Sequence, residues 1–167
     1  TVSGDLVFTS TFGGEILALD REDGSTVWSY EAPGGINGWP AIAGDELYVV
    51  QSNPGAILRI GTSIGSDGET VDVPAGQVEV CAQPSAMVVF GDEGNEYAAI
   101  SCYRPGTIFI VDLSAFRVIE QVFVGSGPHQ MTYDEAREYI YVANSLDATI
   151  SVVDIDDRRA TRFTEVA

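Results

Sequence analysis

Lysine is missing from this 167-residue sequence, and its eight basic residues are all arginine. Against them stand 25 Asp and Glu residues, which give a formal net charge of −17 at pH 7. Such a charge repels phosphate backbones, and no basic patch with interleaved aromatic residues is present, so we expect no nucleic-acid binding. We attribute the acidic excess to a salt-adapted or GC-rich source, with cation binding by the surface as the alternative.

Long hydrophobic runs are absent as well. None approaches the roughly 18–20 residues needed to cross a bilayer, so no membrane span is predicted. Residues 1–5 carry neither a basic nor an apolar stretch, and we expect them to lie inside a longer or already processed chain, which does not exclude secretion. Hydrophobic residues still make up 45% of the sequence, enough for the core of one folded domain.

A repeat organises the chain. Pro40, Pro84 and Pro128 each follow the previous one by 44 residues, and each opens a unit of short strands rich in Val, Ile, Tyr and Phe. A period in the low-to-mid forties with four strands per unit is typical of a β-propeller blade. The third strand of each unit is expected at 56–60, 107–112 and 149–154, and the fourth at 70–74, 118–124 and 160–166. The fold class predicted is all-β, a propeller of about four four-stranded antiparallel blades.

The opening segment fits the same scheme without its first strand, since strands are expected only at 5–10, 15–20 and 26–31. The approximate blade limits are 1–36, 37–80, 81–125 and 126–167. Because a propeller closes when no sheet edge stays open, we expect the missing strand from upstream chain or from another chain. Additional blades of a longer propeller are the preferred source, with a small closed ring or a homodimer as the alternative.

Residues 15–28 resemble the tryptophan-docking motif of quinoprotein (PQQ-type) propeller blades. The matching residues are Ala18, Asp20, Gly24 and Trp28, while Asp23 and Ser25 depart from the usual Thr and Lys. The resemblance covers residues 4 to about 50 and implies a structural role, in which the indole packs between adjacent blades and the Asp and Gly shape a turn. A large flat ring suits such a joint, because it buries much apolar area and its N–H can find a carbonyl.

Residues 84–157 resemble a second propeller family, the YVTN repeats of surface and periplasmic proteins. The best match comprises Gly127-Pro128, residues 139–144 and residues 148–154. This resemblance implies a propeller fold and says little about chemistry. Many such modules bind partners or act as scaffolds, and some propellers of similar shape are lactonases or electron-transfer subunits.

No cofactor is predicted, but the quinoprotein resemblance keeps PQQ with Ca²⁺ as an alternative. That family's vicinal cysteine pair is missing, because Cys81 and Cys102 are 21 residues apart. Trp39 precedes the inner strand opened by Pro40 and could lie near the axis. We prefer to interpret Trp39 as ordinary packing at the start of a blade.

The single histidine, His129, follows Pro128 on the innermost strand of its blade and would face the channel mouth. A lone imidazole is a poor metal site, and a general base also needs a partner acid and a nucleophile in reach. A structural or surface role is preferred, with ligand contact next. The sequence shows no Gly-x-Ser-x-Gly, Cys-x-x-Cys, His-Glu-x-x-His or phosphate-binding glycine loop.

Acidic runs at 20–23 and 154–157 lie where the third strand of a blade turns into the fourth. Carboxylates can hold Ca²⁺ when other oxygens complete the shell, which makes weak metal candidates of Asp154, Asp156 and Asp157. Neither run has EF-hand spacing, so solvated turns are preferred. Asp20, Asp112 and Asp154 recur at one blade position, which suggests turn capping by Asx-type hydrogen bonds.

Cys81 and Cys102 are centred close to the expected hairpin turn at 91–95, so they should lie nearly opposite on paired strands. A disulfide between them is expected, which would suit a periplasmic or extracellular compartment. Two buried free thiols in a reducing cytoplasm are the alternative.

The function predicted is a non-catalytic binding or scaffold module of an exported or cell-surface protein, presenting loops to a protein partner or small ligand. It rests on intact blade-building residues beside missing catalytic ones. The alternatives are part of a PQQ-dependent oxidoreductase and, second, a lactonase-like hydrolase that uses channel-facing residues such as His129.

Overall fold

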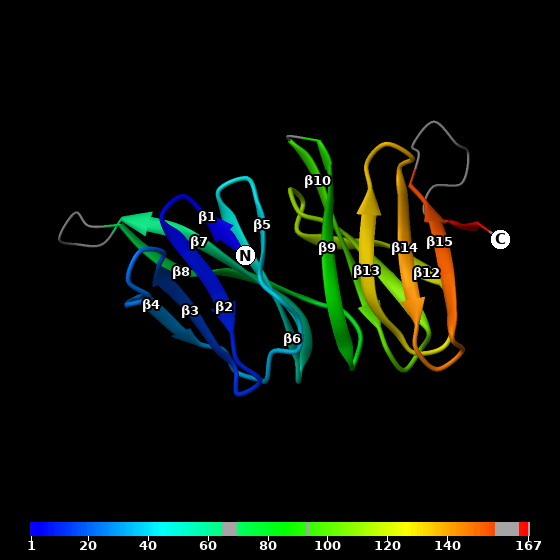
Figure 1. Cartoon of the computed structure of the whole chain (residues 1–167), viewed down its shortest axis with the longest axis horizontal. Coiled ribbons are helices and arrows are strands. Elements are labelled where there is room, and N and C mark those ends of the chain that lie inside the picture. The colour runs from blue at the N-terminus through cyan, green and yellow to red at the C-terminus, as the bar shows by residue number, and fades with distance from the viewer. Residues whose placement is uncertain (65–69, 93, 156–163, 167) are drawn as a thin grey trace. The chain divides into compact units, whose positions relative to one another are not determined.

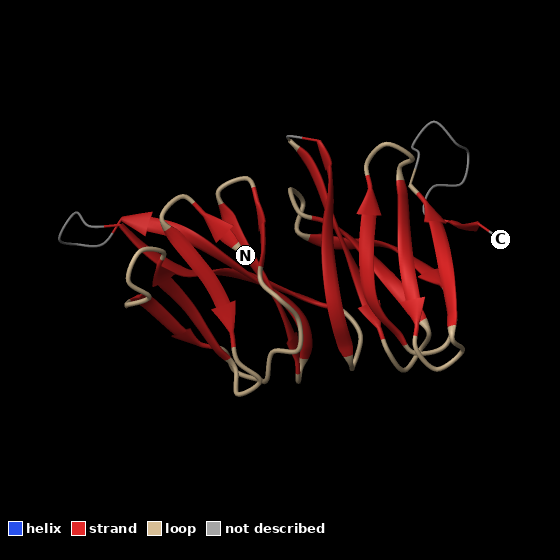
Figure 2. Ribbon diagram, in the orientation of Figure 1, coloured by secondary structure: helices blue, strands red, loops and turns tan. Residues whose placement is uncertain are grey.

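The computed structural model describes residues 1–64, 70–92, 94–155 and 164–166, and within them every regular element is a strand. The strands form four antiparallel four-stranded sheets, each built from four strands that are consecutive in the chain (Figures 1 and 2). The predicted fold class, an all-β propeller architecture of four-stranded blades, is confirmed. We refer to the sheets as blades one to four in chain order.

The strands of each blade are as follows. Blade one holds β1 (Val2–Ser3), β2 (Leu6–Ser10), β3 (Glu15–Asp20) and β4 (Thr26–Glu31). Blade two holds β5 (Ala41–Ala43), β6 (Glu46–Ser52), β7 (Gly55–Ile64) and β8 (Thr70–Glu79). Blade three holds β9 (Pro84–Asp92), β10 (Asn95–Cys102), β11 (Thr107–Asp112) and β12 (Arg117–Phe123). Blade four holds β13 (Pro128–Asp134), β14 (Tyr139–Asn144), β15 (Thr149–Asp154) and β16 (Thr164–Val166).

Blade one has the first strand that the sequence was expected to lack, so this expectation was wrong. β1 pairs with β2 through Val2 and Val7 and through Ser3 and Leu6. Gly4 makes the tight reversal between them with a φ of 55°, a left-handed conformation that glycine adopts without steric cost. A strand of two residues is too short to show an alternating pattern, which is why no sign of it is visible in the sequence.

The fourth strand of blade two is longer than expected, because β8 runs to Glu79 instead of ending at Pro74. It pairs with β7 along its whole length, from Ile64 opposite Thr70 to Ala56 opposite Glu79. The register shifts between Arg59 and Ile60, and Pro74 pairs at this irregularity. A bulge tolerates proline, which cannot donate a ladder hydrogen bond, so the residue expected to end the strand only bends it.

The chain divides into two compact units, Thr1–Glu79 with blades one and two and Val80–Ala167 with blades three and four. In each unit the core forms where the apolar faces of its two sheets meet. In the first unit the core includes Ile16, Ala18, Leu47, Val49 and Leu58. In the second unit the core includes Ala99, Ile108, Ile110, Ile140, Val142 and Val153. Alternate residues of β14 are buried, as a strand with one buried face requires.

One backbone hydrogen bond recurs in blades two to four, between the end of the second strand and the loop that precedes the first strand. The N–H of Ser52 donates to Gly35 O at 2.7 Å, that of Tyr103 to Gln83 O at 3.1 Å, and that of Ser145 to Gly127 O at 2.9 Å. The side chains beside it differ from blade to blade, but the contact brings two loops together at one end of each of these sheets.

In blade four, the loop before the first strand packs closely against the end of the second strand at Gly125. A Cβ added at Gly125 would lie 2.5 Å from Nδ2 and 2.6 Å from Cγ of Asn144, whose side chain is buried and donates to Thr149 Oγ1 at 3.1 Å and Ser151 Oγ at 2.9 Å. We therefore expect Gly125→Ala to lower the free energy of unfolding by about 2 kcal/mol through overpacking. Urea denaturation followed by circular dichroism measures this.

Gly13→Ala is the matched control for Gly125→Ala, because the nearest atom to a Cβ at Gly13 is Thr11 Oγ1 at an ordinary 3.6 Å. It should change the stability little. A Gly125→Ala protein as stable as the Gly13→Ala protein would contradict the tight packing of Gly125 against Asn144.

Candidate binding groove

The second unit carries a groove with a volume of about 500 Å³ at the end of its sheets where the recurring loop contact lies. Three loops surround it: the β10–β11 connection at 103–106, the β12–β13 connection at 124–127 and the β14–β15 connection around Leu146. Its lining comprises Gln83, Tyr103, Arg104, Pro105, Gly106, Phe123, Val124, Ser126, Gly127 and Leu146.

Two large apolar side chains that line this groove are exposed to solvent. Phe123 is 71% exposed and Leu146 is 64% exposed, although each has the kind of side chain that folding normally removes from water. Phe123 is the last residue of β12, on the face opposite the buried Val122, and Leu146 sits in a polar turn between Ser145 and Asp147. Exposed apolar groups rimmed by polar ones typically mark interaction sites.

Two glycines let the loops approach each other closely enough to form the groove. Gly106 has a φ of 65° and its carbonyl accepts from Val124 N at 2.9 Å. Gly127 has a φ of 66°, and a Cβ there would lie 2.6 Å from Leu146 Cγ. A side chain at Gly127 would therefore displace Leu146 from the groove.

One wall of the groove is polar and charged. Among the described residues of the lining, Arg104 is the one that carries a charge, and its Nε donates to Gln83 Oε1 at 3.1 Å. Tyr103 lies beside it and meets the His129 ring edge-on, with 6.5 Å between ring centroids. Next to the lining residues Ser126 and Leu146, a carboxylate oxygen of Asp147 accepts from the Ser126 N–H.

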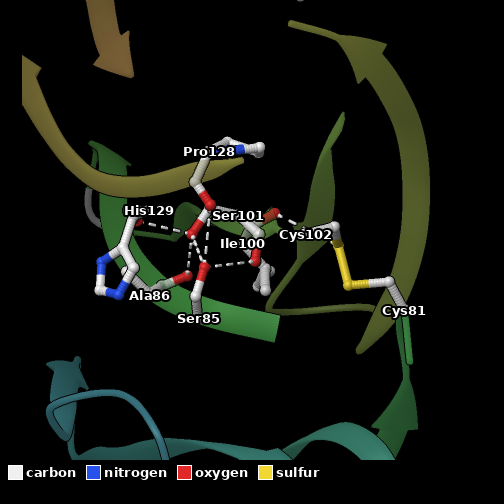
Figure 3. Close-up of a disulfide and its surroundings, with 8 residues drawn as sticks. All are labelled: Cys81, Ser85, Ala86, Ile100, Ser101, Cys102, Pro128 and His129. Carbon is white, nitrogen blue, oxygen red and sulfur yellow. Dashed lines mark hydrogen bonds between the residues drawn. A yellow bond between two sulfur atoms is a disulfide. The ribbon is translucent and has the colours of Figure 1, made fainter. Parts of the chain in front are cut away.

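A disulfide connects the two chain segments that form this wall. Cys81 and Cys102 are bonded with their Cα atoms 5.9 Å apart (Figure 3). Cys102 pairs across the sheet with Pro84, the first residue of β9. Cys81 therefore lies just before β9, whereas the hairpin spacing predicts that it lies on the strand itself. Gln83 lies two residues after Cys81 and Tyr103 follows Cys102, so the bond fixes both chain segments that carry the wall.

Beside the disulfide, buried hydroxyls connect blade three to blade four. Ser85 Oγ lies 3.0 Å from Ser101 Oγ and donates to Pro128 O at 3.0 Å, while Ser101 Oγ donates to His129 O at 2.8 Å (Figure 3). The bonds to Pro128 and His129 end on backbone carbonyls, so they fix the start of β13 against β9 and β10.

The His129 side chain is exposed, and its Nδ1 lies 3.2 Å from Gln130 Nε2. The hydroxyl of Ser101 engages the backbone carbonyl of this residue and not its ring. In the part of the chain that the structure describes, no hydrogen bond joins the imidazole to a carboxylate or to a nucleophile.

Trp39 is 73% exposed, which corrects its interpretation as ordinary packing at the start of a blade. It lines a small cleft of about 150 Å³ in the first unit, together with Phe12, which is 83% exposed. The loop of residues 32–40 carries Trp39 outward before the chain enters β5, a choice that the strand pattern did not reveal.

The docking motif of blade one forms a joint between sheets. Trp28 Nε1 donates to the backbone carbonyl of Asp72 on β8 at 2.9 Å, and its ring packs against the core of the first unit. Ala18 is fully buried opposite Trp28. Asp20 Oδ1 accepts from Glu22 N at 2.7 Å, and Gly24 closes the turn with a φ of 73°. These contacts hold the turn between β3 and β4 and join β4 to β8.

Of the three candidate Ca²⁺ ligands, the structure describes only Asp154. Asp154 is buried, and Asp156 and Asp157 lie outside the described residues. Across the residues that the structure does describe, no three His, Cys, Asp or Glu side chains are grouped so as to hold a metal ion. Cys81 and Cys102 are bonded to each other, and Trp39 lines a cleft of about 150 Å³.

Two exposed turns contain side chains whose pKa values are shifted. A hydrogen bond from Ser25 lowers the pKa of Asp23. A hydrogen bond from Arg137, at 2.7 Å, lowers the pKa of Asp134, and the same contact raises the pKa of Arg137. These shifted groups belong to hydrogen bonds that cap turns.

The sequence patterns do not reveal the groove. Phe123 fits a strand and stands out in no other way, and no motif includes Arg104 or Leu146. A signal is present at Leu146, because a leucine between polar turn residues has no strand face to bury it.

The antiparallel blades and the docked indole define a β-propeller protein with PQQ-type blades. The chain belongs to the family described as outer membrane protein assembly factor BamB, whose model matches residues 1–138. A search of curated protein sequences returns no match. Within the described residues, no helix is long and apolar enough to cross a membrane.

Many solved structures resemble the chain, including the following three. Hydrazine synthase of Kuenenia stuttgartiensis shares 14% identity at a TM-score of 0.76, over 98% of this chain and 45% of that one. Sqt1 from Chaetomium thermophilum shares 11% at 0.66, over 84% and 36%. The β-propeller domain of Cps50 (Swd1) from Myceliophteria thermophila shares 11% at 0.65, over 97% and 54%. These identities establish likeness of fold alone, and the chain spans roughly half or less of each of these structures.

Proposed function

We propose that the chain is a non-catalytic binding module of an exported propeller protein, and that the groove of its second unit receives an extended segment of a partner protein. The observation that carries the proposal is the uncovered pair Phe123 and Leu146 in a cavity of about 500 Å³. A cavity of this size accepts a few side chains, and apolar anchors in such a pocket supply most of the energy of peptide binding.

Two further observations support the proposal. The family description names an assembly factor of outer membrane proteins, a role that concerns other proteins. The disulfide between Cys81 and Cys102 suits such an oxidising compartment. Additional blades, from a longer chain or from a second copy, would complete the ring, since the chain spans 45% of the hydrazine synthase chain that it resembles.

Selection from a displayed library of random octapeptides tests this function. We expect the purified chain to enrich peptides that contain Leu, Phe or Trp, and a synthetic enriched peptide to bind the Phe123→Ser, Leu146→Ser double variant at least about tenfold more weakly. Fluorescence anisotropy of the labelled peptide measures the affinity.

Val27→Ser is the matched control for the double variant, because Val27 is an exposed apolar residue of β4 in the other unit. It should bind the peptide as the native chain does. Selection without enrichment, or peptides that bind the double variant equally well, would overturn the peptide-binding function. Dye reduction on adding PQQ and Ca²⁺, or lactone hydrolysis that is lost in His129→Ala, would overturn its non-catalytic character.

A further inference from the structure

The groove has a charge opposite to that of the protein around it. The chain carries a net charge of −17, yet the charged group that the described part of the chain places in the groove lining is the Arg104 guanidinium. Asp147 lies at the rim, but its carboxylate is engaged by the Ser126 N–H. Arg104 therefore favours an anionic group in the ligand.

Arg104 is oriented by one hydrogen bond through Nε, which leaves its two terminal guanidinium nitrogens to bind a ligand. Its Nε donates to Gln83 Oε1 at 3.1 Å, which uses one of five N–H donors and orients the guanidinium plane. Among the described residues no ion pair or other hydrogen bond involves this side chain, in contrast to Arg137, which binds Asp134 at 2.7 Å. The two terminal nitrogens can thus present the bidentate geometry that matches a carboxylate.

The neighbours of Arg104 define what else the ligand must carry. Phe123 and Leu146 line the same groove, and Pro105 lies between Arg104 and the glycine that brings the loops together. We infer that the groove recognises a peptide segment in which an Asp or Glu side chain, bound by Arg104, is followed or preceded by a large apolar side chain that packs on Phe123 and Leu146. This inference rests on the proposed function and adds its specificity.

The same octapeptide selection, run in parallel on the native chain and on Arg104→Gln, tests the inference. The native chain should enrich Asp or Glu at a fixed spacing from the apolar residue, and Arg104→Gln should enrich the apolar residue alone. For a synthetic enriched peptide, replacing its acid by the matching amide should weaken binding to the native chain about fivefold, the upper range for an ion pair open to solvent. On Arg104→Gln the acid and amide peptides should bind equally.

Two control variants separate charge from geometry and from folding. Arg137→Gln removes an exposed arginine of the same unit outside the groove lining and should leave the acid preference unchanged. Arg104→Lys keeps the charge but loses the fork, so it should retain only part of the preference and show a steeper loss with added salt.

The outcomes distinguish a failure of the acid preference from a failure of the proposed peptide-binding function. Peptides that need Phe123 and Leu146 but show no acid preference, or an acid preference that persists in Arg104→Gln, would overturn the inference and leave the binding function standing. A native chain that enriches no peptide would overturn the function itself, and with it the inference.

Discussion

Replacing Cys81 and Cys102 together by alanine is expected to lower the free energy of unfolding of the second unit by about 3 kcal/mol. The disulfide closes a loop with a sequence separation of 21 residues, so its loss returns conformational freedom to the unfolded chain. Both side chains are buried, which is why alanine is preferred to serine, whose hydroxyl would need a new partner.

Urea denaturation followed by far-ultraviolet circular dichroism measures this loss. Both tryptophans belong to the first unit, so their fluorescence would not report on the second. The native chain unfolded with and without a thiol reductant is the control, and the reduced protein should lose a similar amount of stability. A double variant within about 1 kcal/mol of the oxidised native chain would show that the bond adds little to a hairpin already fixed by its ladder.

The same double variant should also bind groove peptides more weakly than its loss of stability alone explains. Gln83 and Tyr103 lie next to the bonded cysteines and form the wall that orients Arg104. Releasing the bond lets this wall move, so ordering it on binding costs additional free energy.

Trp28→Ala should lower the free energy of unfolding of the first unit by about 3 kcal/mol. The substitution removes a large ring that packs against the core of this unit, and it leaves the Asp72 carbonyl without the indole donor at 2.9 Å. Because this joint connects β4 of blade one to β8 of blade two, the loss should reduce the cooperativity between the two sheets.

Two substitutions calibrate that result. Trp28→Phe keeps most of the buried ring and loses the N–H, so it should cost only about 1 kcal/mol. Trp39→Ala removes the second tryptophan, which is 73% exposed, and should stay within about 0.5 kcal/mol of the native chain. The ordering Trp28→Ala, Trp28→Phe, Trp39→Ala is the prediction, measured by denaturation followed by circular dichroism, and equal effects of the two alanine variants would refute it.

The recurring loop contact connects these predictions to the groove. Each of the last three blades ties the end of its second strand to the loop before its first, but the side chains at the joint are Gln51 near Gly34, Cys102 bonded to Cys81, and Asn144 against Gly125. The backbone hydrogen bond is thus the same in the three blades, while the side-chain contacts beside it differ. In the second unit the loops held in this way are the ones that carry the groove.

The strand pattern predicted most of this architecture from local information. The strands at 15–20, 26–31, 107–112 and 149–154 have the limits expected for them, because Val, Ile and Tyr alternate between faces and Gly, Asp and Asn mark the turns. β1 was missed because two residues show no period. β8 was cut short because Pro74, a local signal, was tolerated by a bulge that depends on pairing with β7.

Local sequence is enough to specify the blade, because a strand's alternation, its turns and the spacing of Pro40, Pro84 and Pro128 are properties of residues near one another in the chain. Folding in three dimensions settles which tryptophan is docked and which faces water, and it brings Phe123, Leu146 and Arg104 to one groove. Exposure and proximity depend on which loops the closing hydrogen bonds and glycines bring together. Those loops are separated by about half a blade in sequence, a distance over which no local pattern carries information.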